Sequence, residues 1–197
     1  MLRIALTGGI ATGKSYILDQ FRRRGVPCLD ADELAHGVMA PGTEATQAIA
    51  ARFGADVLAA DGAVDRAKLG PIVFADANAR RELEAIVHPA VYRAITVGLR
   101  AFERIGGSPL AVVDVPLLYE TGHASDFDRV IVAICSLDRQ VQRLVKRGMT
   151  ETEAHQRLAA QWPTEEKASR ADFVIRTDGS HEETDGQIEG IFKDLRI

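Results

Sequence analysis

The chain has 197 residues, of which 46% are hydrophobic and 26% are charged, and these shares are ordinary for a globular protein. They exclude a disordered chain, a collagen and a disulfide miniprotein, and a chain of this length needs no metal or disulfide to fold. The formal net charge of −4 argues against a general nucleic-acid-binding surface, although a local basic patch for a smaller anion is compatible with it.

The N-terminus and the longest apolar run predict neither secretion nor membrane insertion. The first residues lead directly into glycines, without the basic, apolar and cleavage regions of a signal peptide. The apolar run 110–118 is interrupted by Asp114 and Pro116 and is shorter than the ~20 residues that span a bilayer. Cys28 and Cys135 lie outside any metal-binding or redox spacing. We therefore expect a soluble, cytoplasmic protein with two buried thiols.

Short apolar runs predict strands, and helical stretches lie between them. Most runs lack in/out alternation, as expected of strands that are buried on both faces of a parallel sheet. Strands are predicted at 2–7, 26–30, 110–115, 129–135 and 173–176. Alternating strands and helices indicate an α/β fold with a parallel sheet.

Two long insertions interrupt this alternation. The segment 31–109 is too long for one crossover helix. Its predicted helices are 33–39, 44–53, 66–74, 77–87 and 90–105. The segment 137–171 carries two predicted helices around 148–150, and a capping box begins at Thr150. A first helix is predicted at 15–24, and a last helix follows a polar loop at 177–184.

The strongest motif is Gly8-Gly9-Ile10-Ala11-Thr12-Gly13-Lys14-Ser15, which fits GxxxxGK[ST] in full. It lies between a predicted strand and a predicted helix, which is the context of a phosphate-binding loop. Glycines let backbone N–H groups approach phosphate oxygens, and the helix N-terminus adds positive potential. Lys14 then reaches the β- and γ-phosphates, and the Ser15 hydroxyl can ligate Mg²⁺.

The motif predicts nucleotide binding, and other features of the sequence exclude several classes of nucleotide-binding protein. The chain has a single Asn, so it has no guanine-reading NKxD motif, and it has no DxxG switch. A motor or a large ATPase needs a longer chain. Among these nucleotide-binding classes, only a small-molecule kinase is left. We predict a single kinase domain, 1–197, with a helical acceptor insertion at 33–108 and a lid insertion at 137–171.

Carboxylates follow two of the predicted strands. Asp30 and Asp32 come after the second strand, at the edge of a parallel sheet where ligands bind. A kinase needs a carboxylate that orients the acceptor hydroxyl and takes its proton, and either acid could instead cap the next helix. We favour Asp32 over Asp30 as the base. Asp114 has two possible interpretations. It is a Walker B acid near Mg²⁺, or it is an acid held by backbone N–H groups of the turn after the strand. Glu120, after Pro116, could close an acceptor pocket.

Three arginines are spaced for one helix face. Arg139, Arg143 and Arg147 lie at i, i+4 and i+8, which suits bidentate binding of a polyphosphate. The alternative is a solvated basic face paired with acidic residues of the next helix. His88 is more often a structural residue than a ligand when it stands alone, and Trp162 is expected to pack.

In this order and spacing the chain resembles the dephospho-coenzyme A kinase family over 2–191. Besides the phosphate loop, the resemblance rests on Asp30-Ala31-Asp32, His88-Pro89, Val115-Pro116-Leu117-Leu118-Tyr119-Glu120, the arginines ending at Arg147, Arg157 with Gln161, and Ala171-Asp172-Phe173-Val174-Ile175. It implies a P-loop fold with five parallel strands, helices on both faces, a helical acceptor domain and a mobile lid. It also implies transfer of the ATP γ-phosphate to the ribose 3′-hydroxyl of dephospho-coenzyme A. We expect Mg²⁺ as the cofactor, and no obligate protein partner is evident.

The resemblance assigns roles by position, with Asp32 as the base, and we expect Lys14 to be the second catalytic residue. The expected ATP-binding residues are Gly8, Gly9, Ala11, Thr12, Gly13, Lys14, Ser15, Tyr16, Arg139, Arg143 and Arg147. The expected acceptor-binding residues are Asp30, His88, Pro89, Leu117, Glu120, Arg157 and Gln161. Ser15 and Asp114 are the expected metal ligands.

Three departures from the family pattern concern the nucleotide. Ala11 replaces a usual Gly, Tyr16 replaces a usual Thr, and 176–179 replaces a segment that usually has Asn near adenine. The last departure bears on base selectivity. The alternatives are another small-molecule kinase, such as a nucleoside monophosphate kinase, and a nucleotide-binding regulator without turnover, against which Asp32 argues.

Overall fold

In the computed structural model, residues 1–196 are described, and the chain divides into two compact units. One unit comprises Met1–Cys28 together with the described chain from Phe102 onward. The other is Leu29–Ala101. The acceptor role that we predict for 33–108 and the lid role for 137–171 stay predictions.

A parallel sheet forms the centre of the first unit and confirms the predicted fold class. Its strands have the order β2-β3-β1-β4-β5. Their bounds are β1 Leu2–Gly8, β2 Cys28–Asp30, β3 Leu110–Asp114, β4 Arg129–Ile134 and β5 Phe173–Arg176. β1 pairs in parallel with β3 and β4, so Leu6 lies beside both Asp114 and Ile131. The carboxyl ends of β1 and β3 therefore meet at one edge of the sheet.

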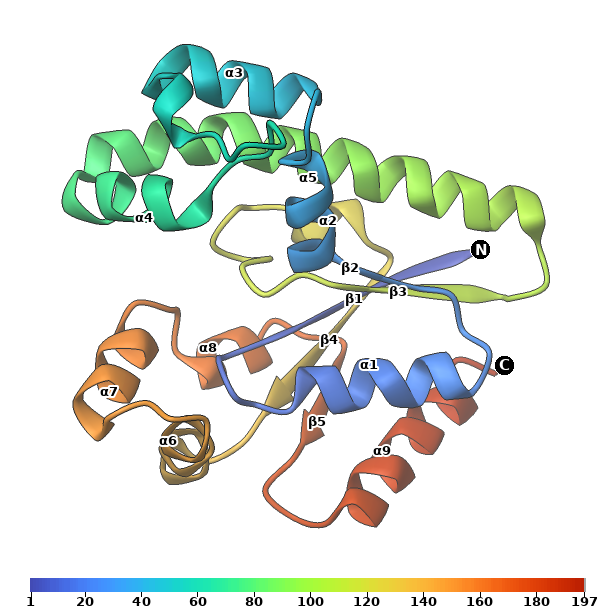
Figure 1. Ribbon diagram of the computed structural model, residues 1–197. Helices are drawn as coiled ribbons and strands as arrows, with labels where there is room; N and C mark the ends of the chain where they lie inside the picture. The colour runs from blue at the N-terminus through green and yellow to red at the C-terminus, as the bar shows by residue number, and fades with distance from the viewer. Residues whose placement is uncertain (197) are drawn as a thin grey trace. The chain divides into compact units, whose positions relative to one another are not determined.

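Both faces of this sheet are buried, which explains the missing alternation. Helices α1 (Lys14–Arg23) and α9 (His181–Asp194) lie side by side (Figure 1). Ile17, Phe21 and Ile188 of these helices join the same buried cluster as Leu6. Ala5 points to the opposite face, because successive strand residues alternate, and is also fully buried.

The 137–171 segment contains three helices, not the two predicted. They are α6 Leu137–Lys146, α7 Glu151–Ala159 and α8 Thr164–Ala168, and α8 is too short to show a helical period in the sequence. The predicted capping box at Thr150 is confirmed. Helix α9 starts inside the predicted loop 177–184, because Ser180 and Glu183 form a second capping box there.

The second unit is helical and has its own core. Its elements are α2 Ala31–Val38, α3 Glu44–Phe53, a 3₁₀ turn Ala55–Val57, α4 Arg66–Ala75 and most of α5 Ala77–Ile105. Ile49, Val57, Leu69 and Val73 are buried together.

The predicted break between helices 77–87 and 90–105 is wrong. Helix α5 is continuous over 29 residues and contains Pro89. A proline inside a helix removes one hydrogen bond and opposes the turn before it. Here the residues that follow, Ala90, Val91 and Ile95, are buried on one side of the helix. Burial of this apolar side outweighs the local cost of the proline.

Within residues 1–196, no helix is long and apolar enough to cross a bilayer. Both cysteines are free, but only Cys135 is buried, so the expectation of two buried thiols is wrong for the half-buried Cys28. Burial raises the pKa of both thiols, that of Cys28 to about 11, so both are poor nucleophiles at neutral pH.

Candidate active site

The predicted phosphate loop connects β1 to α1 and has the backbone that its glycines suggest. Gly13 is the N-cap of α1 and has a positive φ of 89°. A Cβ atom at Gly8 would stand 2.4 Å from the carbonyl oxygen of Ala133 on the neighbouring strand β4. Glycine is therefore required at Gly8 by close approach and favoured at Gly13 by conformation.

Ala11 adopts the left-handed conformation in the same loop, with φ 61°. It is buried, and its carbonyl oxygen accepts a hydrogen bond from Arg143 Nη1 at 3.0 Å. A side chain in this conformation costs about 1–2 kcal/mol. The loop thus keeps its shape without the usual glycine, and tertiary contacts offset the strain.

Ala11→Gly is expected to raise the free energy of unfolding by about 1 kcal/mol, or about 2–4 °C in Tm, because relief of strain exceeds the added chain entropy. Thermal unfolding measures this change. The matched control is Ala48→Gly in the regular helix α3, which should lower stability by about 1 kcal/mol. A loss of stability at Ala11 as large as at Ala48 would contradict this account of the loop.

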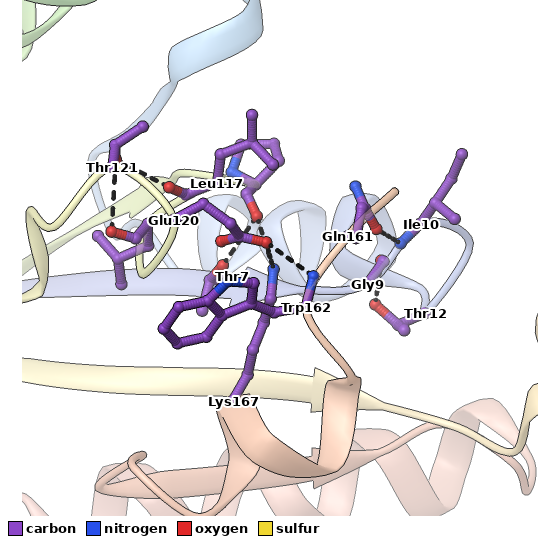
Figure 2. Close-up of polar contacts among 12 residues, drawn as sticks. Thr7, Gly9, Ile10, Thr12, Leu117, Glu120, Thr121, Gln161, Trp162 and Lys167 are labelled. Atoms are coloured by element: carbon purple, nitrogen blue, oxygen red, sulfur yellow. Dashed lines mark hydrogen bonds and ion pairs between the residues drawn. The ribbon is translucent and has the colours of Figure 1, made fainter. Parts of the chain in front are cut away.

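Two glutamine side chains hold the backbone N–H and the backbone carbonyl of Ile10 (Figure 2 shows the N–H contact). Gln161 Oε1 accepts from the Ile10 N–H at 2.8 Å, and Gln140 Nε2 donates to the Ile10 carbonyl at 2.7 Å. Thr12 Oγ1 donates to the Gly9 carbonyl at 2.8 Å. The predicted acceptor-binding role of Gln161 stays a prediction, and its side-chain amide oxygen also supports the phosphate loop. Gln140 was not predicted, because a buried glutamine on an amphipathic helix has no motif.

The three arginines have different positions. Arg143 donates through Nη1 to Thr177 Oγ1 as well as to Ala11 O, and through Nη2 to Thr177 O at 2.6 Å. Arg139 Nη2 donates to the Asp178 carbonyl at 2.9 Å. Arg147 is the exposed C-cap residue of α6, and its guanidinium has no partner within the described chain. Arg143 therefore shapes the loop, whereas Arg147 is available for a ligand.

Lys14 and Ser15 begin α1, at the positive end of its dipole. Neither side chain makes a hydrogen bond or ion pair with any residue of 1–196. A lysine at a helix N-terminus is unfavourable for the helix unless an anion is bound there. The loop therefore combines donors and charge for an anion that residues 1–196 do not supply.

An aromatic pair lies beside this loop. Tyr16 stacks on His181 with ring centroids 4.1 Å apart, and its hydroxyl donates to Asp185 Oδ1 at 3.0 Å. A pocket of about 190 Å³ opens next to them. It is lined by Ala11, Gly13, Tyr16, Arg143, Arg147, Thr177, Gly179, His181 and Thr184. Sequence reasoning did not single out His181, which is distant from the loop along the chain.

The predicted metal ligands fit Mg²⁺ by their chemistry. Asp114 is 5% exposed at the carboxyl end of β3, and Ser15 is exposed at the start of α1. Carboxylate and hydroxyl oxygens suit Mg²⁺, which is usually held by one or two protein groups together with phosphates and water. In the described part of the chain, no group of three or more His, Cys, Asp or Glu residues could hold a metal ion.

The loop after β3 carries two predicted acceptor residues. Leu117 is exposed, and Glu120 Oε1 lies 2.7 Å from Nζ of the buried Lys167 (Figure 2). Lys167 was not predicted, because nothing in the sequence distinguishes it from a surface lysine. Arg157, a third predicted acceptor residue, is exposed on α7.

The remaining predicted residues belong to the second unit. Asp30 caps α2, since its carboxylate accepts from the Asp32 N–H at 2.8 Å and from the Glu33 N–H at 3.2 Å. Asp32 is exposed, and its carboxylate has no partner among residues 1–196. The capping alternative therefore applies to Asp30. His88 is half-buried and Pro89 is exposed on α5.

Comparison with known proteins agrees with these features. Residues 2–183 match the family model described as dephospho-CoA kinase. A dephospho-CoA kinase of Anaeromyxobacter dehalogenans is 50% identical over 197 residues, covering 98% of this chain and 92% of the relative. A dephospho-CoA kinase of Geobacillus kaustophilus is 47% identical, covering 98% of this chain and 96% of the relative. The solved dephospho-CoA kinase of Campylobacter jejuni is 25% identical with a TM-score of 0.74, covering 98% and 96%. With a glycine-rich phosphate loop on a parallel sheet and similarity along nearly its whole length, the chain belongs to the dephospho-CoA kinase family.

Proposed function

We propose that the protein transfers the γ-phosphate of ATP to the ribose 3′-hydroxyl of dephospho-coenzyme A, giving coenzyme A and ADP. This reaction is the last step of coenzyme A biosynthesis. The observation that carries the proposal is the phosphate loop, whose backbone is held by Gln140, Gln161 and Arg143. The side chains of Lys14 and Ser15 have no partner among residues 1–196. Membership of the family supports the choice of acceptor.

In the reaction, an electron pair of the 3′-oxygen forms a bond to the γ-phosphorus, and the bond from phosphorus to the β,γ-bridging oxygen breaks. Asp32 takes the proton of the 3′-hydroxyl, since its carboxylate is exposed and is not needed for capping. Lys14 and the loop N–H groups stabilise the charge on the phosphate oxygens. Ser15 and Asp114 would hold Mg²⁺, which when bound neutralises phosphate charge.

The pocket beside Tyr16 and His181 is the proposed site of the nucleobase. The phosphates occupy the loop, so the nucleoside leaves it on the side where α1 begins. The pocket opens on that side and has an aromatic wall and an arginine, which suit a flat heterocycle. The acceptor-binding roles of Asp30, His88, Pro89, Leu117, Glu120, Arg157 and Gln161 remain part of this proposal.

A turnover assay tests the proposed function. ATP consumption is measured with dephospho-coenzyme A, with each nucleoside monophosphate and with no acceptor, and the product is identified by mass. We expect one phosphate to be added to dephospho-coenzyme A alone. Preference for a nucleoside monophosphate would favour the alternative kinase class, and ATP binding without turnover would favour a regulator.

Arg147→Lys is expected to lower kcat more than it raises the KM for dephospho-coenzyme A. Lysine keeps the charge but loses the planar fork that binds two phosphate oxygens at once. Steady-state kinetics with both substrates varied give the comparison. The control is Lys146→Arg, its exposed neighbour on α6, which should leave both constants unchanged. A rise in the acceptor KM alone would instead place Arg147 at the acceptor.

A further inference from the structure

Lys167 is a fully buried lysine that the proposed reaction does not use. It lies on α8 and its side chain is 0% exposed, which is rare for lysine unless the ammonium is paired. Its Nζ is 2.7 Å from Glu120 Oε1 and donates to the Pro116 carbonyl at 3.2 Å (Figure 2). Both partners belong to the loop that follows β3.

Pro116 and Glu120 are each connected to the phosphate loop, through different hydrogen bonds. The Pro116 carbonyl also accepts from Thr7 Oγ1 at 3.3 Å, and Thr7 directly precedes Gly8. Glu120 Oε1 also accepts from the Trp162 N–H at 3.3 Å. Trp162 directly follows Gln161, whose side chain holds the Ile10 N–H of the phosphate loop.

Figure 2 shows the Lys167 side chain, the Glu120 carboxylate and the backbone of Trp162 close together, with the contact between Gln161 and Ile10 to one side. The Lys167 side chain thus connects three segments that are distant in sequence: the end of β1, the loop after β3, and the chain that enters α8. Movement of Glu120 or Trp162 would move Gln161, and with it the Ile10 peptide of the phosphate loop.

Stability alone does not account for such a pair. Removing two charges from water costs free energy, and an apolar pair of similar volume is often as stable or more so. The charged pair gives the loop a defined geometry, because the hydrogen bonds of Lys167 to Glu120 and Pro116 fix distances and angles that an apolar contact does not fix.

We propose that Lys167 is a positioning residue for nucleotide binding, holding the phosphate loop in its binding shape through Glu120 and Pro116. The inference rests on the proposed function, since it concerns the nucleotide that the loop binds. Lys167 acts through other residues and does not touch the nucleotide.

The test is the affinity for ADP of Lys167→Met, measured by calorimetry in the full chain without acceptor. Without acceptor, any contact of Glu120 with that substrate does not enter the result. We expect ADP to bind about 3- to 30-fold more weakly, the range typical of coupling through a contact network. The matched control is Arg170→Met. The exposed guanidinium of Arg170 lies over the Trp162 ring, and its removal should leave ADP affinity unchanged.

A double variant separates positioning from stability. Lys167→Met with Glu120→Leu removes both charges, so we expect Tm to recover toward the wild-type value while ADP binding stays weak. If Lys167→Met does not fold, the double variant carries the test. Recovery of ADP affinity together with Tm, or an affinity of Lys167→Met within twofold of the control, would overturn the proposal. Failure of the wild type to bind ADP would instead refute the proposed function.

Discussion

Lys14→Ala is expected to lower the rate of phosphoryl transfer by at least about 10²- to 10³-fold, the usual cost of removing one group that stabilises transition-state charge. The fold should not suffer. The Lys14 side chain has no partner within residues 1–196, and removing a cation from the N-terminus of α1 favours the helix dipole. Alanine is also a strong helix former. Activity should therefore fall while Tm stays within a few degrees or rises slightly.

The measurement combines kcat/KM for ATP with thermal unfolding of the same preparation. Lys193→Ala, in the last turn of α9, is the matched control, because it removes an exposed lysine outside the proposed site. Its activity should equal that of the wild type. Retention of activity within a few-fold by Lys14→Ala would show that the loop is not the phosphate site.

Asp32→Asn is expected to lower kcat by at least about 10², because positioned proton transfer contributes about 10²–10⁴ in rate. The substitution is nearly isosteric and removes only the charge. Stability and ATP affinity should stay close to wild type, since the Asp32 carboxylate is exposed and has no partner in the described part of the chain. Single-turnover kinetics, ATP binding and Tm are measured on the same variant.

The matched variants are at Asp30. Asp30→Asn should cost much less activity, because asparagine also caps a helix well. Asp30→Ala should lower the free energy of unfolding by about 1 kcal/mol, whereas Asp32→Ala should not, since Asp30 is the residue that caps α2. A larger loss of kcat at Asp30 than at Asp32 would move the base assignment to Asp30.

Features formed by neighbouring residues could be predicted from the sequence. The phosphate loop is contiguous, and its glycines, lysine and serine each have a local reason for their position. The strands were recognised because a strand buried on both faces is an unbroken apolar run. The capping box at Thr150 was predicted because it needs only residues three apart.

Other features depended on packing that no local pattern contains. Pro89 signals a helix end in the sequence, yet burial of the residues beyond it keeps α5 continuous. The sequence left both Asp30 and Asp32 as possible caps, and only the backbone geometry assigned that role to Asp30.

The supports of the phosphate loop were decided by the tertiary structure alone. Gln140 and Gln161 reach Ile10 from 130 and 151 residues away, and Lys167 reaches Pro116 across 51. Arg139, Arg143 and Arg147 are evenly spaced in the sequence, but among them it is Arg143 that donates to the carbonyl oxygen of Ala11 in the phosphate loop. The sequence by itself determined the group that meets the phosphate, because that chemistry lies in one short segment. Which side chains hold that segment in shape was decided by folding, because hydrogen-bond partners distant in sequence are brought together only when the sheet and its helices pack.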